Sequence, residues 1–449
     1  MKALIIAAGN GTRMQPVTQG RHKSLMELLG LKIIERVILG AKEAGISEFV
    51  IVTGYKGREF QKTVGDGRKY GISIKYEQNN VWHKANGISV LKAKNHFSNE
   101  NFVLLMSDHV FSYKTLIRIQ RLKLKGKECA LAVDRHLDGV LDLEDTTKAV
   151  VKGTGITALN KNLEVYNAFD TGMFVCSPYI FKVLEQTTKR GKNSLSDGMR
   201  VLAGQGLLRA FDNRGRFWAD CDTYADIKYA EKKLLSSLTK SADGIVSKKL
   251  NRPVSTFITR RLIKTPVTPN IISFSIPVIA ALTLLVLAQG TYPWLILGAF
   301  MVQFMSIFDG CDGELARLKF IGSDWGGFLD ATLDKYVDTA VIAGMAYGYW
   351  RVSGNELIWL VSAFLLLALI LDGYMPNKFS VLMGKRLSWS GFNFKRDTRL
   401  LVLAIGILVN QIMPVLVISL VLLNYMVIAR LVFGKKISEG LVKQPSVSL

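Results

Sequence analysis

Four aspartates stand at paired spacings inside a long apolar part of the chain. Asp309 and Asp312 are three residues apart, and Asp330 and Asp334 are four residues apart, so each pair would share one face of a helix. A carboxylate within a membrane helix is costly unless it is paired or binds a metal, and its oxygens suit hard divalent cations. The spacing therefore predicts two helices that hold one or two such cations. Solvated acids at helix ends are the alternative.

A glycine-rich loop near the N-terminus forms a second candidate site. Gly9, Gly11 and Arg13 follow the apolar run 2–8. The backbone N–H groups of such a loop can hold phosphates, and Arg13 can meet an anionic leaving group. A plain tight turn would also explain the glycines, but polar residues farther along favour a binding site. These residues are Lys23, Asn86, Asp108, Asp170 and Asp222.

The elements that must position this loop alternate between strands and helices. Asp108 follows the apolar run 102–106, and the carboxyl end of such a strand usually opens onto the ligand crevice. Asp222 precedes a helix expected over about 223–238, so a helix N-cap role is equally open. The alternation predicts a predominantly parallel, doubly wound sheet. Its expected strands are 2–8, 49–53, 72–76, 102–106 and 130–133.

The composition separates two parts of the 449-residue chain. The chain is 49% hydrophobic with a net charge of +22, which excludes disorder and leaves nucleic acid or an anionic membrane face as partners. Its four cysteines are too widely spaced for a disulfide scaffold. Residues 271–308 and 400–429 carry no charge. We expect a cytoplasmic domain over 1–238, a basic connector over 239–264 and a membrane domain over 265–449.

Six membrane helices of about 20 residues each fit the last of these domains. The expected spans are 271–289, 292–312, 327–350, 356–375, 399–413 and 414–432. Basic residues gather in the connector, in the loop 376–399 and near the C-terminus, whereas the opposite loops carry only Arg351. The positive-inside rule then predicts an integral protein of the cell membrane with both termini in the cytoplasm. A basic chain placed beside a bilayer disfavours nucleic acid as its partner.

The aspartate segment resembles the signature of the CDP-alcohol phosphatidyltransferases, and 265–435 looks like that family throughout. The matching pattern is Asp309-x2-Asp312-Gly313-x2-Ala316-Arg317-x8-Gly326-x3-Asp330-x3-Asp334. The resemblance implies a two-metal site for Mg²⁺ or Mn²⁺ framed by the four aspartates, with Asp334 as the base for the acceptor hydroxyl. It implies that CMP is displaced from a diphosphate. The residues implied to hold the CDP moiety are Gly313, Ala316, Arg317 and Gly326.

Basic residues before the fifth expected helix have two interpretations. Lys395, Arg396 and Arg399 would form a pocket for an acceptor phosphate, because guanidinium groups bind phosphate oxygens in pairs. Ordinary positive-inside charge explains them equally well. The segment RDTRLL also resembles the branch of the family that uses inositol phosphate.

The first domain, over about 1–235, resembles the sugar-phosphate nucleotidyltransferases, which have a Rossmann-like α/β fold. The resemblance implies that Asp108 and Asp222 bind the catalytic Mg²⁺ and that Lys152 and Asp170 lie near the acceptor sugar phosphate. His22 stands where that family usually has proline, which could displace the loop of Lys23. The residues implied to bind and neutralise the nucleotide are Gly9, Gly11, Arg13, Lys23 and Asn86.

Both families in one chain suggest consecutive reactions. The combination, with VYNAFDTGMF in the first domain, resembles a family that joins an inositol-1-phosphate cytidylyltransferase to a di-inositol-phosphate-phosphate synthase. It implies CTP and inositol 1-phosphate as substrates and CDP-inositol as the intermediate. A homodimer through the membrane domain is also expected. The alternatives are a phospholipid synthase that uses CDP-diacylglycerol, a first domain that only binds nucleotide, and a nucleic-acid-binding module.

Overall fold

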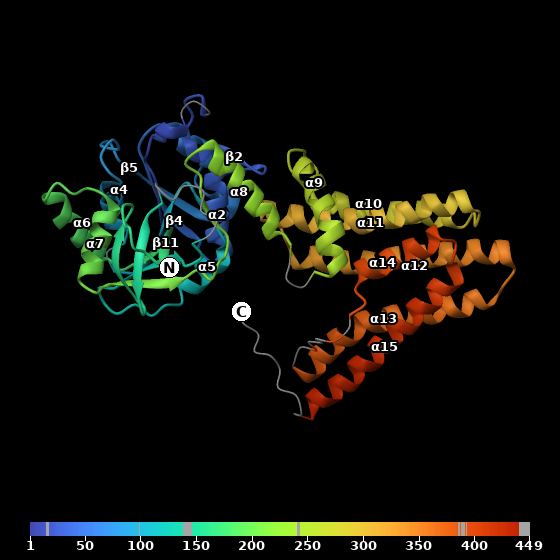
Figure 1. Cartoon of the computed structure of the whole chain (residues 1–449). Coiled ribbons are helices and arrows are strands. Elements are labelled where there is room, and N and C mark those ends of the chain that lie inside the picture. The colour runs from blue at the N-terminus through green and yellow to red at the C-terminus, as the bar shows by residue number, and fades with distance from the viewer. Residues whose placement is uncertain are drawn as a thin grey trace. The chain divides into compact units, whose positions relative to one another are not determined.

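The structure, a computed structural model, divides into two compact units, Met1–Ser237 and Leu238–Leu449. The residues it describes are 1–14, 18–97, 99–137, 146–239, 243–384, 387, 391 and 393–439. The boundary follows α8 (Tyr224–Ser237), so the described part of the expected connector belongs to the second unit. Figure 1 colours the first unit from blue to green and the second from yellow-green to red.

A nine-stranded sheet forms the centre of the first unit, in the order β5-β4-β1-β6-β11-β8-β12-β10-β9. The strands β5, β4, β1 and β6 are parallel, as expected, but β11 runs antiparallel to both β6 and β8. The sheet is therefore mixed rather than predominantly parallel. Its strands are β1 (Ala3–Ala7), β4 (Glu48–Thr53), β5 (Ser73–Gln78), β6 (Phe102–Met106), β8 (Cys129–Asp134), β9 (Lys148–Lys152), β10 (Gly155–Asn160), β11 (Ala168–Cys176) and β12 (Leu208–Asp212).

Alternate side chains of each strand face two different helix layers. On β1, Leu4 and Ile6 belong to one hydrophobic core, while Ala3, Ile5 and Ala7 belong to the other, which follows the two-residue period of a strand. The first core is covered by α4 (Gly87–Lys92), α6 (Tyr179–Lys189) and α7 (Leu195–Gly204). The second is covered by α2 (Ile33–Glu43), α3 (Gly57–Val64) and α5 (Tyr113–Ile119). Both faces are buried, so polar residues collect at the strand ends.

Two short antiparallel pairs lie outside this sheet. In one pair, β7 (His109–Phe111) and β13 (Trp218–Asp220) place His109 opposite Asp220. The other pair is β2 (Glu27–Leu28) with β3 (Leu31–Lys32). Short helical turns complete the unit: η1 (Thr12–Met14), η2 (Lys23–Leu25), η3 (Arg68–Tyr70) and η4 (Lys94–His96).

The second unit is helical in its described residues. Helix α10 packs against α11 and α12, and α13 packs against α15 (Figure 1). Each expected span overlaps mainly one helix from α10 to α15, but the fifth, 399–413, runs past the end of α14 into α15 through a turn in which Asn410 has a φ of +56°. The elements are η5 (Ser247–Asn251), α9 (Arg252–Leu262), α10 (Pro269–Leu287), α11 (Tyr292–Lys319), α12 (Asp324–Ser353), α13 (Leu357–Met383), α14 (Arg396–Leu408) and α15 (Ile412–Ser438).

Among the described helices, four are long and apolar enough to cross a membrane: α10, α11, α13 and α15. Helix α12 has the length but carries Asp330, Asp334 and Asp338. Helix α14 has 13 residues, about 20 Å at 1.5 Å per residue, which is shorter than a hydrocarbon core of about 30 Å. The expected count of six spans is therefore not confirmed.

Helices α10 and α12 approach each other to backbone contact. A Cβ added at Gly348 would lie 2.1 Å from the carbonyl oxygen of Leu287, and one at Gly344 would lie 2.9 Å from Cα of Leu284. Small residues allow such close approach between membrane helices. A larger side chain at either glycine would force the two helices apart.

Candidate functional site

The glycine-rich loop after β1 lies against Lys23. Gly11 has a φ of +58°, and a Cβ there would lie 2.9 Å from Cδ of Lys23, so glycine is needed both for this backbone conformation and for the close approach. A cavity of about 250 Å³ opens here. The sequence-predicted residues that line it are Gly9, Gly11, Arg13, Lys23, Asn86, Asp108 and Asp222. The structure thus brings together all the residues that the sequence assigned to nucleotide binding in this unit.

Lys23 forms ion pairs with Asp108 and Asp222, and Arg13 forms an ion pair with Asp222. Burial alone would lower the pKa of Lys23, but the two carboxylates outweigh it and raise the pKa above its ordinary value. Burial alone would raise the pKa of Asp108, and Lys23 and His109 hold it below its usual range. Lys23 and Asp108 are therefore both charged, and Lys23 can neutralise phosphate oxygens in the cavity.

His22 fixes the loop of Lys23 rather than displacing it. Its buried ring donates from Nε2 to the Ala7 carbonyl at 3.1 Å and accepts at Nδ1 from the Ser24 backbone N–H at 3.2 Å, and these partners assign the tautomer. Ser24 Oγ is also hydrogen-bonded to Ser107 Oγ at 2.8 Å. Hydrogen bonds thus tie η2 to the ends of β1 and β6.

We expect the stability of the first unit to fall below neutral pH because of His22. Burial lowers the pKa of His22 from 6.5 to about 4, even though the bond to Ala7 opposes the shift. Between these two values the unfolded chain binds a proton that the folded chain does not. The free energy of unfolding should therefore decrease by up to about 3 kcal/mol as the pH falls from 6.5 to 4.

Hydrogen exchange of the strands β1 and β6 in the full chain measures this pH dependence. His22→Gln should remove most of the decrease between pH 6.5 and 4. Parallel pH curves for the two proteins would show that His22 is not its source.

His109 and Asp220 were given no role from the sequence, yet both lie beside Asp108. One ligand atom from each of the three residues lies within 4.8 Å of the others. Asp220 Oδ1 is buried and, among the described residues, has no hydrogen-bond partner. Burial raises the pKa of Asp220 to about 7, whereas the pKa of His109 rises to about 10 because Asp220 and Asp108 outweigh its burial. Asp220 Oδ1 lies 3.7 Å from His109 Nδ1, and a buried carboxylate oxygen beside a second carboxylate fits a divalent cation.

Asp170 lines a neighbouring cavity of about 270 Å³ that shares Lys23 and Asp108 with the first. Its Oδ1 accepts from the Gly172 N–H at 2.7 Å, and burial raises the pKa of Asp170 to about 6. Lys152, at the end of β9, is exposed and is not among the described residues that line either cavity. Of the two residues predicted in this unit to lie near the acceptor, Asp170 therefore lines a cavity and Lys152 does not.

Asp309 of α11 and Asp330 and Asp334 of α12 form an acidic cluster in the second unit. One carboxylate oxygen from each lies within 4.8 Å of the others. The four-residue spacing places the two α12 aspartates on one helix face. This all-oxygen set fits a hard divalent cation.

Asp312 lies outside this cluster, and its carboxylate accepts from Ser273 Oγ at 2.7 Å and from the Gly313 N–H. A Cβ at Gly313 would lie 3.2 Å from Nη1 of Arg317. Arg317 Nε is buried and has no hydrogen-bond partner among the described residues, so it is a donor that a ligand could use. The other residues predicted to hold CDP are Ala316, on α11, and Gly326, in the first turn of α12.

Arg396 of α14 contacts three carboxylates, one on α11 and two on α12. Its Nη1 contacts Asp309 Oδ2 at 2.9 Å and Asp334 Oδ1 at 2.8 Å, and its Nε donates to Asp338 Oδ1 at 3.2 Å. The buried Arg399 donates from Nη2 to Asp338 Oδ2 at 2.7 Å. Asp338, which was given no role from the sequence, therefore holds both arginines, and only Arg396 reaches the acidic cluster.

A cavity of about 230 Å³ lies beside this cluster. Arg396, Asp309 and Asp334 line it, whereas Lys395, the N-cap residue of α14, is not among its described lining residues. Residues of η5 and α9 form another part of its lining, namely Ser247, Asn251, Arg252 and Ser255. The described part of the connector thus contributes to the second site.

Comparison with known proteins identifies both units. Residues 2–138 match the family described as Nucleotidyl transferase, and residues 266–433 match the family described as CDP-alcohol phosphatidyltransferase. A protein of Rubrobacter xylanophilus named Bifunctional IPC transferase and DIPP synthase is 33% identical over 90% of this chain and 89% of its own. A protein of the same name from Thermococcus kodakarensis is 36% identical over 84% of this chain and 82% of its own.

A third protein of that name, from Aquifex aeolicus, is 30% identical over 97% of this chain and 98% of its own. These relatives confirm the fusion of the two families that the sequence motifs indicated. The chain belongs to the family of bifunctional IPC transferases and DIPP synthases.

Proposed function

We propose that the chain catalyses two consecutive reactions, one in each unit. CTP and inositol 1-phosphate give CDP-inositol and diphosphate, and CDP-inositol then reacts with a second inositol 1-phosphate to give di-inositol phosphate phosphate and CMP. The observation that carries the proposal is the presence of two acidic sites in a member of this family, each beside a basic side chain, Lys23 or Arg396, and a cavity of its own.

In the first reaction, a phosphate oxygen of inositol 1-phosphate attacks the α-phosphorus of CTP, and diphosphate leaves. The loop of Gly9 and Gly11 would hold the triphosphate, while Arg13 and Lys23 neutralise the charge that develops on it. Their convergence on one cavity supports this role. Asp170 would bind the inositol phosphate from the adjoining cavity.

In the second reaction, Asp334 takes the proton of an acceptor hydroxyl. The resulting oxygen attacks the β-phosphorus of CDP-inositol, and CMP leaves with the electrons of the broken P–O bond. Arg317, whose buried Nε has no partner among the described residues, would hold the CDP moiety. Arg396 lines the same cavity as Asp334 and would bind the acceptor phosphate.

The two acidic groups would hold Mg²⁺ or Mn²⁺, which lowers the charge repulsion between phosphates and attacking oxygens when bound. Asp108 and Asp222 are the proposed ligands in the first unit, where both line the nucleotide cavity, and Asp220 lies close enough to Asp108 to add a further carboxylate oxygen. Asp309, Asp330 and Asp334 are the proposed ligands in the second unit, while Asp312, the fourth predicted ligand, is hydrogen-bonded to Ser273 and Gly313.

We place the second unit in the cell membrane with six helices across it and both termini and the first unit in the cytoplasm. The four long apolar helices support a place in the membrane, and the basic residues of the connector support the cytoplasmic side for the first unit. A homodimer formed through the second unit completes the proposal. Protease protection in sealed vesicles and chemical crosslinking test these two points.

Purified full-length protein with CTP, inositol 1-phosphate and Mg²⁺ tests the proposed reactions directly. Mass spectrometry should detect CDP-inositol, CMP and di-inositol phosphate phosphate, and diphosphate should be released. A parallel reaction supplies CDP-diacylglycerol as the donor. Use of the lipid donor alone would overturn the proposal in favour of a phospholipid synthase.

A further inference from the structure

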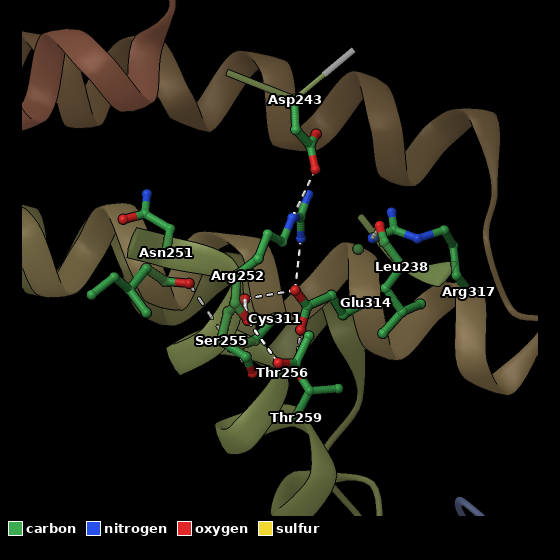
Figure 2. A network of polar contacts seen from close by, with 12 residues as sticks. Leu238, Asp243, Asn251, Arg252, Ser255, Thr256, Thr259, Cys311, Glu314 and Arg317 are labelled. Atoms are coloured by element: carbon green, nitrogen blue, oxygen red, sulfur yellow. Dashed lines mark hydrogen bonds and ion pairs between the residues drawn. The ribbon is translucent and has the colours of Figure 1, made fainter. Parts of the chain in front are cut away.

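Glu314 is a fully buried carboxylate on α11 that does not belong to the acidic cluster. It accepts from Arg252 Nη1 at 2.7 Å, from Ser255 Oγ at 2.6 Å and from Thr259 Oγ1 at 2.7 Å. Figure 2 shows these donors, all from α9, converging on the carboxylate. A buried charge is tolerated when it is compensated in this way, so Glu314 fixes α9 to α11.

Further contacts hold the turn that precedes α9. Arg252 donates from Nε to Asp243 Oδ2 at 2.9 Å, so its guanidinium is shared by two acids (Figure 2). The Asn251 amide donates to Ser306 Oγ at 3.0 Å and accepts from Gln303 Nε2 at 2.9 Å. The segment η5–α9 is therefore attached to α11 by polar side chains along its length.

This segment is also a wall of the cavity that contains Asp309 and Asp334. Ser247, Asn251 and Ser255 line the cavity, and Ser255 at the same time donates to Glu314. The turn η5 is π-helical, a conformation that occurs frequently at functional sites. The segment η5–α9 thus carries both the polar groups that line the cavity and the residues that bind Glu314.

The lining of this cavity suits a phosphorylated polyol. Hydroxyl and amide groups of η5 and α9 can exchange hydrogen bonds with alcohol groups, and Arg396 can bind a phosphate. We propose that Glu314 is a positioning residue for the acceptor of the second reaction, because it holds this wall of η5 and α9 in place. The inference rests on the proposed function of the second unit.

Glu314→Gln tests the inference in the full-length protein, because it keeps the shape of the side chain and removes its charge. The rate of phosphodiester formation is measured at saturating CDP-inositol with varied inositol 1-phosphate. We expect the KM for inositol 1-phosphate to rise about tenfold, with a change in kcat of less than about threefold. Formation of CDP-inositol from CTP in the first unit should be unchanged.

Asp372→Asn is the matched control. It breaks an ion pair with Arg430 that joins α13 to α15, and neither residue lines the cavity. We expect this variant to lower the melting temperature while the KM for inositol 1-phosphate stays at the wild-type value. An unchanged KM in Glu314→Gln, or an equal rise in both variants, would overturn the positioning role.

Thr259→Val keeps the inference testable should Glu314→Gln fail to fold. It removes one hydrogen bond to Glu314 without touching the cavity, and Thr283→Val is its control in another buried helix position. A rise in KM confined to Thr259→Val supports the inference, and no difference from Thr283→Val contradicts it. If the wild-type protein uses only CDP-diacylglycerol, the proposed function is wrong. The inference is then tested by comparing the KM for the acceptor between variant and wild type with CDP-diacylglycerol as the donor.

Discussion

Asp334→Asn is expected to stop formation of the phosphodiester product and to let CDP-inositol accumulate. The amide cannot accept the proton of the acceptor hydroxyl, and the acidic cluster with Asp309 and Asp330 loses a charged ligand atom. Loss of a general base alone lowers the rate by about 10³-fold. Because the nucleotidyl transfer takes place in the other unit, its rate should remain that of the wild type.

Time courses of CDP-inositol and di-inositol phosphate phosphate by mass spectrometry check this expectation. Asp324→Asn is the matched control, since Asp324 is an exposed residue at the start of the same helix, and it should behave as wild type. Wild-type product formation by Asp334→Asn would exclude Asp334 as the base. Loss of both activities in a folded variant would contradict the independence of the units.

Lys23→Met should have the opposite phenotype. It removes the cation that contacts both Asp108 and Asp222 in the nucleotide cavity, so the charge developing on the phosphates is no longer neutralised. We expect diphosphate release from CTP to fall by about 10³-fold. Added CDP-inositol should restore the final product to the wild-type rate, because the second unit is unaltered.

Diphosphate release and product formation with and without added CDP-inositol are the two measurements. The control is Lys62→Met, which changes an exposed lysine of α3 and should retain both activities. If CDP-inositol does not rescue Lys23→Met, the variant has lost more than the first reaction. Circular dichroism then establishes whether the variant is folded.

The strands β1, β4 and β6 could be predicted because each contains a short apolar run. The strand β11 could not, because Asp170, Thr171 and Gly172 interrupt its apolar pattern. Its insertion antiparallel between β6 and β8 depends on long-range pairing. The sequence pattern therefore predicted the class of the domain but not the mixed topology of its sheet.

In the candidate sites, too, residues close in sequence could be predicted to lie together, whereas residues brought together by long-range pairing could not. Asp309, Asp330 and Asp334 were predictable because helical spacing relates them within a short segment. Asp220 was not, because it meets His109 only through the pairing of β13 with β7, and those two residues are far apart in the chain. Asp338 continues the spacing of Asp330 and Asp334, so a signal existed for it, but its binding of Arg399 depends on how α14 packs.

The family matches confirm the prediction that the two units are a nucleotidyl transferase and a CDP-alcohol phosphatidyltransferase. His22 shows how the structure refines such a prediction. The departure from the family pattern left the position of the Lys23 loop open, and the structure shows the His22 ring hydrogen-bonded to Ala7 and Ser24, with Lys23 lining the cavity.

Backbone contact at Gly344 and Gly348 leaves little room for α10 and α12 to move relative to each other. At Gly344 and Gly348 the backbones of the two helices are in direct contact, so we expect Asp330 and Asp334 of α12 to move together with α10. The segment η5–α9 and the start of α14 are attached by side-chain contacts, which can exchange partners. We therefore expect any widening of the cavity for a substrate to involve the side-chain contacts of η5–α9 and α14 rather than a separation of α10 from α12.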